Sequence, residues 1–147
     1  MDLKMETDMD CLAQLSEDQK IAFMKAFARL AAADGNVDED EMAYIKNVAV
    51  VYGVSPQRVN EILKVDSDDE VVEAVKIINN RRAALELIKE MCILAHADDV
   101  LSDEETVLIG KVGMAMGVDL EKIEQISNWV IDRIIWLEEA KIIFEEV

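Results

Sequence analysis

An acidic stretch occurs twice in this chain, at residues 33–41 and again at residues 97–105. The offset from Asp34 to Asp98 is 64 residues, and it holds without a gap on both sides of the two stretches. Identical residues at this offset include Lys25 and Lys89, Leu30 and Leu94, Ile45 and Ile109, Gly53 and Gly117, and Ile62 and Ile126. A repeat of this length predicts one supersecondary unit used twice, with each copy burying its apolar face against the other.

Apolar residues recur at helical spacing along most of the chain, and capping residues mark the points where helices begin. The pattern predicts long helices over about 17–33 and about 81–97. Each is followed by an acidic turn and a second helix, which ends at Gly53 in the first copy and at Gly117 in the second. The two halves therefore follow the same order of helices.

The remaining segments are also helical in pattern. Shorter helices are expected after Ser55-Pro56 and after Ser67, while residues 1–14 form either a short docking helix or a frayed arm. Asp119 caps the last stretch, which is either one long helix or two helices broken near Ser127 or Leu137.

No segment alternates like a β-strand, and no connection is long enough for a parallel crossover, so the chain is all-α. Its 147 residues are enough for one domain with its own core, spanning residues 1–147. We expect a compact helical domain of about seven to eight helices. It is built from two pseudo-symmetric helical repeats, at about 17–78 and about 81–147.

Charge, cysteine content and hydropathy limit the classes of partner and the locations that we expect for the chain. Fifteen basic and thirty-two acidic residues give a formal charge of −17, which repels phosphate backbones, so we expect no nucleic-acid binding. Cys11 and Cys92 are too few for a zinc motif or a disulfide framework and fit a reducing compartment. No signal peptide or membrane-spanning run is evident, so the expected location is the cytoplasm or its membrane face.

Carboxylates flank both acidic turns at equivalent positions. They are Asp34, Asp38 and Glu41 in the first copy, and Asp98, Asp99 and Glu105 in the second. If the two copies pack about a pseudo-twofold axis, the turns would face each other and bring these carboxylates together. Hard divalent cations such as Ca²⁺, Mg²⁺ and Mn²⁺ prefer oxygen-only sites of this kind.

The same carboxylates also have a purely structural interpretation. Glu41 and Glu105 stand at the third position of a capping box, where they would satisfy backbone N–H groups and the helix dipole. Asp34 and Asp98 can likewise cap the backbone of a tight turn. Spacing alone leaves both the metal site and the capping role open.

The doubled motif is similar to a motif of a known protein family. Ala-Asp, with Glu seven residues after the Asp and Gly-Val ending the next helix, resembles the TerB-like family across about residues 17–126. That family is named for tellurite resistance proteins and is related to the N-terminal region of certain membrane-tethered J-domain cochaperones. The resemblance implies two related helical halves, an acidic surface that chelates divalent metal, and a place in bacterial stress or phage defence. The implied acidic positions are Asp34, Glu41, Asp98 and Glu105; the second turn departs at Asp99, where the first has Gly35.

Several single residues have two interpretations. Trp129 and Trp136 share a helix face, and filling a core or an interface is favoured over forming an exposed protein-binding stripe. Gly110 and Gly113, inside a predicted helix, indicate that another helix approaches closely. His96 is the only histidine and is expected to lie at a surface or boundary.

These observations lead to two functional hypotheses. The first is a non-enzymatic TerB-like module that binds a divalent cation through the twin acidic turns in a stress-response assembly. No nucleophile or general-base pair is evident, so we do not expect an enzyme. The second is an interaction module whose acidic face, or whose Trp/Met face, docks a protein partner without metal. Homodimerisation, and peripheral association with a membrane through a partner, are further expectations.

Overall fold

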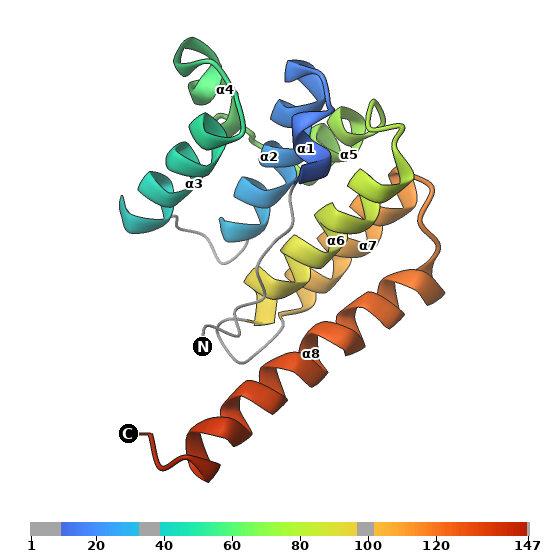
Figure 1. Ribbon diagram of the computed structural model, residues 1–147. Helices are drawn as coiled ribbons and strands as arrows, with labels where there is room; N and C mark the ends of the chain where they lie inside the picture. The colour runs from blue at the N-terminus through green and yellow to red at the C-terminus, as the bar shows by residue number, and fades with distance from the viewer. Residues whose placement is uncertain (1–9, 33–38, 97–101, 147) are drawn as a thin grey trace.

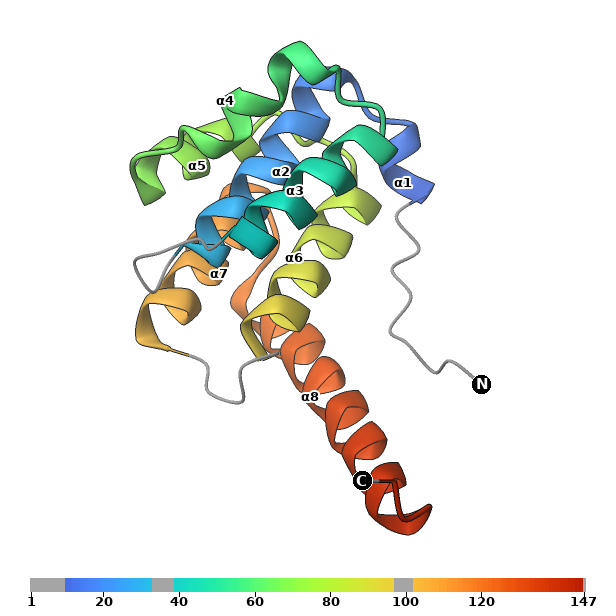
Figure 2. The same cartoon turned by 90° about the vertical axis from the view of Figure 1, so that its left-hand side faces the viewer.

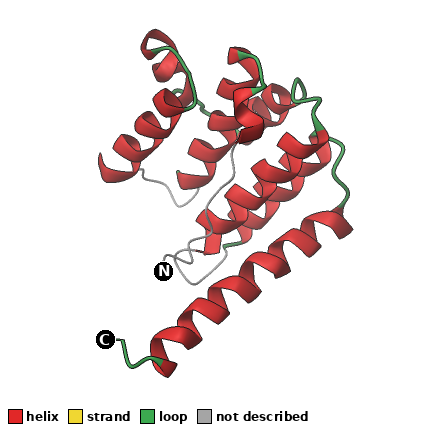
Figure 3. Cartoon of the chain, viewed as in Figure 1, coloured by secondary structure: helices red, strands yellow, loops and turns green. Residues whose placement is uncertain are grey.

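The structure is a computed structural model, and it describes residues 10–32, 39–96 and 102–146. The regular elements in these residues are all helical (Figure 3), so the prediction of an all-α fold is confirmed. The elements are α1 (Asp10–Ala13), α2 (Glu17–Ala31), α3 (Glu39–Val51), a 3-10 turn (Pro56–Arg58), α4 (Val59–Leu63), α5 (Asp68–Val75), α6 (Arg81–His96), α7 (Asp103–Ala115) and α8 (Leu120–Ile143).

Side-chain caps set the starts of the helices where the sequence predicts them. Ser16 and Gln19 form a full capping box, in which each side chain accepts a hydrogen bond from the backbone N–H of the other residue, at 3.1 and 2.9 Å. The Ser67 hydroxyl accepts from the backbone N–H at the start of α5. Asp119 Oδ1 accepts from Lys122 N at 2.8 Å and opens α8.

Glycines close α3 and α7 in the same way. Gly53 and Gly117 have φ values of 92° and 83°, in the left-handed region that favours glycine. The next residue then donates its backbone N–H to a carbonyl one turn back: Val54 to Ala49 at 2.9 Å, and Val118 to Gly113 at 2.8 Å. The predicted ends of these two helices are confirmed.

Two segments that the sequence left open are settled by the structure. Residues 120–143 form one continuous helix, so neither Ser127 nor Leu137 breaks α8. At the other end, α1 docks against α6, and its Leu12 is fully buried. The docking alternative is therefore correct for the described part of the N-terminal segment.

Helices α2 and α6 lie at the centre of the fold and contribute to its core. Helix α2 packs against α3, α4, α5 and α6, while α6 also contacts α1, α7 and α8 (Figures 1 and 2). Phe23 on α2 and Leu87 on α6 are completely buried among these helices. Met24 and Met91 are buried as well, which confirms a core role for these two methionines.

Helix boundaries repeat at the 64-residue offset. Helices α2 and α6 begin at Glu17 and Arg81, and α3 and α7 cover residues 39–51 and 103–115. The 3-10 turn and α8 start at the next matching pair, Pro56 and Leu120, but α4 ends at Leu63 whereas α8 continues to Ile143. The order of helices thus repeats, while a symmetry axis relating the two halves in space stays a prediction.

Gly113 explains how α8 reaches α7 and α6. A Cβ atom at Gly113 would lie 2.5 Å from Ile123 Cδ1 on α8 and 3.2 Å from Ile88 Cδ1 on α6. The predicted close approach is therefore confirmed at Gly113. It is wrong at Gly110, where a Cβ atom would lie 3.9 Å from Leu120 Cδ2, an ordinary van der Waals contact.

These two glycines give a matched test of the α7–α8 contact. Gly113→Ala is expected to lower the free energy of unfolding by about 1–2 kcal/mol, because the added methyl overpacks the interface. Gly110→Ala is expected to be neutral or to stabilise by up to about 1 kcal/mol, because alanine is the better helix former and space is present. Urea unfolding followed by circular dichroism measures both. Equal effects of the two substitutions would contradict this packing.

Candidate functional site

The structure describes only part of the predicted metal site. Asp34, Asp38, Asp98 and Asp99 lie outside the described residues, as does the side chain of Glu41. Glu105 is described: its Oε1 accepts from Ser102 N at 3.1 Å, and its own N–H donates to Ser102 Oγ at 3.1 Å. This is the capping role of the structural alternative.

Among the described residues, no three His, Cys, Asp or Glu side chains are grouped so as to hold a metal ion. Because five of the six predicted ligands are not part of that comparison, the metal site stays a prediction.

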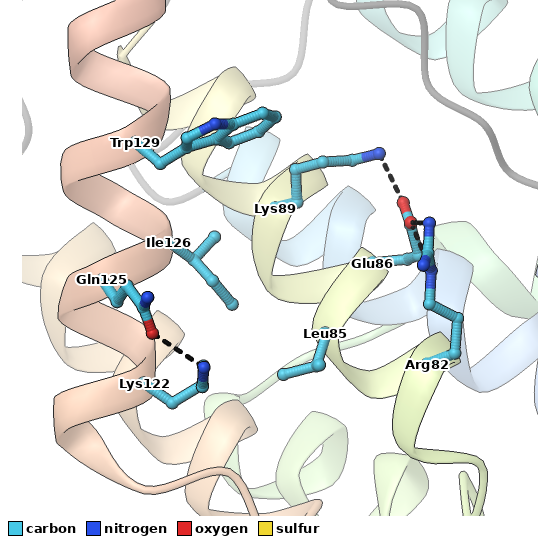
Figure 4. A pocket seen from close by; sticks show the side chains of 8 residues that line it. All are labelled: Arg82, Leu85, Glu86, Lys89, Lys122, Gln125, Ile126 and Trp129. Atoms are coloured by element: carbon cyan, nitrogen blue, oxygen red, sulfur yellow. Dashed lines mark hydrogen bonds and ion pairs between the residues drawn. The ribbon is translucent and has the colours of Figure 1, made fainter.

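A pocket of about 320 Å³ lies between α6 and α8 (Figure 4). It has an apolar floor, one aromatic wall and several charged side chains at its rim. The lining residues are Arg82, Leu85, Glu86, Lys89, Lys122, Gln125, Ile126 and Trp129.

Helical spacing places these residues together. On α6 the lining positions are three and four residues apart, and the same holds on α8, so each set forms one stripe along its helix. The two stripes face each other because α8 docks on α6, with Ile123 seated over Gly113. Trp129 then closes one end of the pocket, above Ile126 (Figure 4).

The rim of the pocket is locally basic in a strongly acidic chain. Arg82 donates from Nε to Glu86 Oε1 at 2.9 Å, and Lys89 forms an ion pair with the same carboxylate. Lys122 Nζ donates instead to the neutral Gln125 side chain at 2.7 Å. Three cationic side chains thus line the pocket against one carboxylate, which leaves it able to accept an anionic group.

Two carboxylates of α6 are buried: Glu86 in the lining of the pocket and Glu90 one helical turn further along. Glu86 and Glu90 are only 5% and 4% exposed. Burial raises the pKa of Glu90 to about 7, an effect that the nearby charge of Lys89 reduces and that of Glu86 increases. Lys89 Nζ lies 3.6 Å from Glu90 Oε1.

Sequence reasoning missed this pocket, although a signal for it exists. At the 64-residue offset, Glu86 and Glu90 correspond to Ala22 and Ala26, which are also buried. Glutamates at positions where the other half of the chain has buried alanines are expected to be buried too. Because buried carboxylates require charged partners, this substitution indicates a buried charge network on α6.

The pocket continues into an uncovered apolar surface on α8. Ile123 and Val130 are buried, but no residue of α8 after Val130 is. Trp129 and Trp136 are 52% and 53% exposed, so filling of the core is the wrong interpretation for both. Both side chains are exposed on α8, and filling of an interface and a protein-binding stripe both stay predictions. Trp136 is exposed because the C-terminal half of α8 runs past the body of the protein (Figure 2), and Trp129 is exposed because it stands at one end of the open pocket.

The other polar groups near α8 do not form an activated nucleophile. Burial raises the pKa of the Cys92 thiol to about 11, so the thiol stays protonated and unreactive at neutral pH. His96 is half-buried, as expected, and its Nε2 lies 3.3 Å from Ser127 Oγ. Burial also lowers the pKa of His96, which favours the neutral ring.

Comparison with known families locates the resemblance. Residues 6–64 match the model of a family described as tellurite resistance protein TerB. Over these residues the chain is TerB-like. The match covers α1 to α4, which is less than half of the chain, so a TerB-like second half stays a prediction. No curated protein and no solved structure matches the chain. The pocket between α6 and α8 lies beyond the matched residues.

Burial of Glu90 predicts an unusual dependence of stability on pH. The folded carboxyl keeps its proton up to about pH 7, whereas an ordinary glutamate loses it near pH 4.5. The folded state therefore binds more protons between these values, and stability falls as pH rises through this window. Glu90→Gln removes this loss and is expected to be more stable than the wild type at pH 8, by roughly 1–3 kcal/mol.

Urea unfolding at pH 5.5 and at pH 8 measures this effect. Glu124→Gln is the matched control, because it removes an exposed carboxylate of α8. The control is expected to keep the pH dependence of the wild type. If Glu90→Gln keeps it as well, Glu90 is not the group responsible.

Proposed function

We propose that this protein is a non-enzymatic TerB-like interaction module that binds an acidic, partly apolar protein segment. The segment occupies the pocket between α6 and α8 and continues along the exposed face of α8. One observation carries this proposal: the basic rim of the pocket surrounds an apolar floor and borders an uncovered tryptophan stripe.

Charge complementarity identifies the chemistry of the partner. A basic or neutral segment would leave the positive rim unmatched, whereas carboxylates of a partner can pair with Lys122 and share Arg82 and Lys89 with Glu86. The charge of −17 over the whole chain opposes an acidic partner only weakly, since salt screens charges further than about 8 Å away at physiological ionic strength.

The apolar side chains supply the expected affinity. Tryptophan and arginine are enriched among the residues that dominate binding energy at protein interfaces. Trp129 forms one wall of the pocket, where a partner side chain would be enclosed by Leu85 and Ile126. Burial of apolar surface there stabilises a complex by about 25 cal/mol per Å² before the costs of association.

Peptide binding tests this proposal. The probe is a labelled helical peptide with an Ile and Phe stripe flanked by Glu, compared with the same peptide carrying Lys in place of Glu. We expect saturable binding of the acidic peptide alone, with a change in tryptophan emission. Lys122→Glu is expected to weaken binding about tenfold or more, because it places a carboxylate in the anion position.

Lys46→Glu is the control for this experiment, since it makes the same change of charge on an exposed position of α3. It is expected to leave binding nearly unchanged. Equal binding of the two peptides would refute the proposal, and so would equal losses in the two variants.

Divalent-cation binding through the twin acidic turns is a second candidate function. It is favoured by the repeat of helix boundaries, because α3 and α7 begin at matching positions after the two turns, and α2 and α6 end within one residue of matching positions before them. The proposed ligands remain Asp34, Asp38 and Glu41 with Asp98, Asp99 and Glu105, and the cation is Ca²⁺, Mg²⁺ or Mn²⁺.

Calorimetric titration of chelator-treated protein at moderate salt tests the metal site. The variant combines Asp34→Asn, Glu41→Gln, Asp98→Asn and Glu105→Gln, and glutamine keeps the capping box intact. Saturable binding that persists in salt and disappears in the variant is expected. Weak binding that falls with ionic strength and survives in the variant would be a counterion cloud only.

The TerB-like match supports a place in a tellurite-resistance-like stress response, which we propose as the setting of the module. Among the described residues, no helix is both long enough and apolar enough to cross a membrane. We propose that the protein acts in the cytoplasm and that any association with the membrane face is through a partner.

A further inference from the structure

The C-terminal half of α8 requires a covering surface. Seven of the thirteen large apolar side chains that are exposed among the described residues lie on α8 or directly after it. After Val130 the apolar residues point to most sides of the helix: Ile131, Ile134, Ile135, Trp136, Leu137, Ile142 and Ile143. A helix that is apolar on most sides is normally buried.

One exposed stripe of α8 has a regular spacing. Trp136 lies seven residues after Trp129 and seven residues before Ile143. Seven residues are close to two helical turns, so the three side chains share one face. All three are at least half exposed. Trp136 is therefore the midpoint of the stripe formed by Trp129, Trp136 and Ile143.

We propose that the occupant of this stripe is α8 of a second copy of the chain, packed antiparallel about a twofold axis at Trp136. This inference rests on the proposed function and names its partner. Trp136 then meets the partner's Trp136, and Trp129 meets the partner's Ile143. Such an interface is self-complementary, as twofold symmetry requires.

Charge supports the antiparallel direction. Glu145 and Glu146 follow the end of α8, where the chain turns at the left-handed Glu145. In this register the partner's Ile143, the last residue of its α8, lies opposite Trp129, so the two carboxylates after it lie near the basic rim of the pocket. Lys122 lies one helical turn from residue 126 and pairs with no carboxylate in the described residues, so it can pair across the interface. A parallel arrangement would instead place Lys122 beside the partner's Lys122, with like charges facing.

The shape of the molecule permits this arrangement. The N-terminal half of α8 packs on the body, and its C-terminal half extends away from it (Figures 1 and 2). Two copies joined by antiparallel C-terminal halves would hold their bodies at opposite ends of the helix pair. The twofold axis would place the acidic C-terminal end of each chain beside the basic pocket of the other, so the same contact would form twice.

Disulfide cross-linking tests the direction and the register together. In a Cys11→Ser background, one preparation carries Trp129→Cys and a second, larger by an affinity tag, carries Ile143→Cys. Mixing them under mild oxidation is expected to give the mixed dimer in large excess over either self-linked dimer. Self-linked Trp129→Cys dimers in excess would mean a parallel pair and would overturn the proposal.

Sedimentation measures the dimer itself. Trp136→Arg is expected to raise the dimer dissociation constant at least about hundredfold, since two guanidinium groups would meet at the axis. Trp136→Leu, which keeps an apolar group there, is the control and is expected to stay within about tenfold of the wild type. Equal effects of the two substitutions would overturn the placement of Trp136 at the axis.

A charge-reversal cycle tests the contact between the acidic end and the pocket. Lys122→Glu alone, and Glu145→Lys with Glu146→Lys, are each expected to weaken the dimer by about threefold to tenfold. Combining all three substitutions is expected to restore most of the loss. Additive weakening in the combined variant would show that these groups do not meet.

Tryptophan quenching separates failure of this inference from failure of the proposed function. Trp129 and Trp136 are the only tryptophans, so acrylamide quenching reports on α8 alone. A monomer at all concentrations with readily quenched tryptophans would overturn the homodimer but leave the surface free for another partner. A monomer with protected tryptophans would overturn both the homodimer and the proposed function, because α8 would then be covered by its own chain.

Discussion

The seating of Ile123 over Gly113 fixes the position of α8, and the candidate site depends on that position. Gly113 lacks the side chain that would keep α8 away, so α8 lies against α7 and α6 over its N-terminal turns. This contact brings Lys122, Ile126 and Trp129 opposite the basic face of α6. Because the contact involves only the N-terminal half of α8, it also leaves most of the second half exposed, apart from Ile134, which packs against the core. Pocket and exposed stripe are therefore two consequences of one packing contact.

The charge network on α6 gives the pocket its electrostatic character. Glu86 and Glu90 occupy buried positions at which the first half of the chain has alanine, and their burial is tolerated because Lys89 and Arg82 lie beside them. The raised pKa of Glu90 shows that the compensation is incomplete. A network of this kind costs stability, which is consistent with a role in recognition rather than in holding the helices together.

Local chemistry made much of the fold predictable. The capping boxes at Ser16 and Ser102 and the left-handed glycines at Gly53 and Gly117 are set by neighbouring residues, so the sequence alone locates these helix ends. The pocket depends instead on which face of α6 meets α8, and no local pattern contains that information. The core interpretation of Trp129 and Trp136 was wrong for the same reason, since their spacing shows a shared face but not whether another element of the chain covers it. Of the predicted acidic ligands, only the capping role of Glu105 can be compared with the structure.

The central claim is that a partner covers the second half of α8, and we propose that this partner is a second copy of the chain. Hydrogen exchange of the α8 amides, followed as a function of protein concentration, tests this. Exposed helical segments without tertiary contacts open readily and exchange fast. We expect the protection of residues 131–143 to rise with concentration while that of residues 120–130 stays constant. High protection of residues 131–143 that does not change on dilution would contradict the claim.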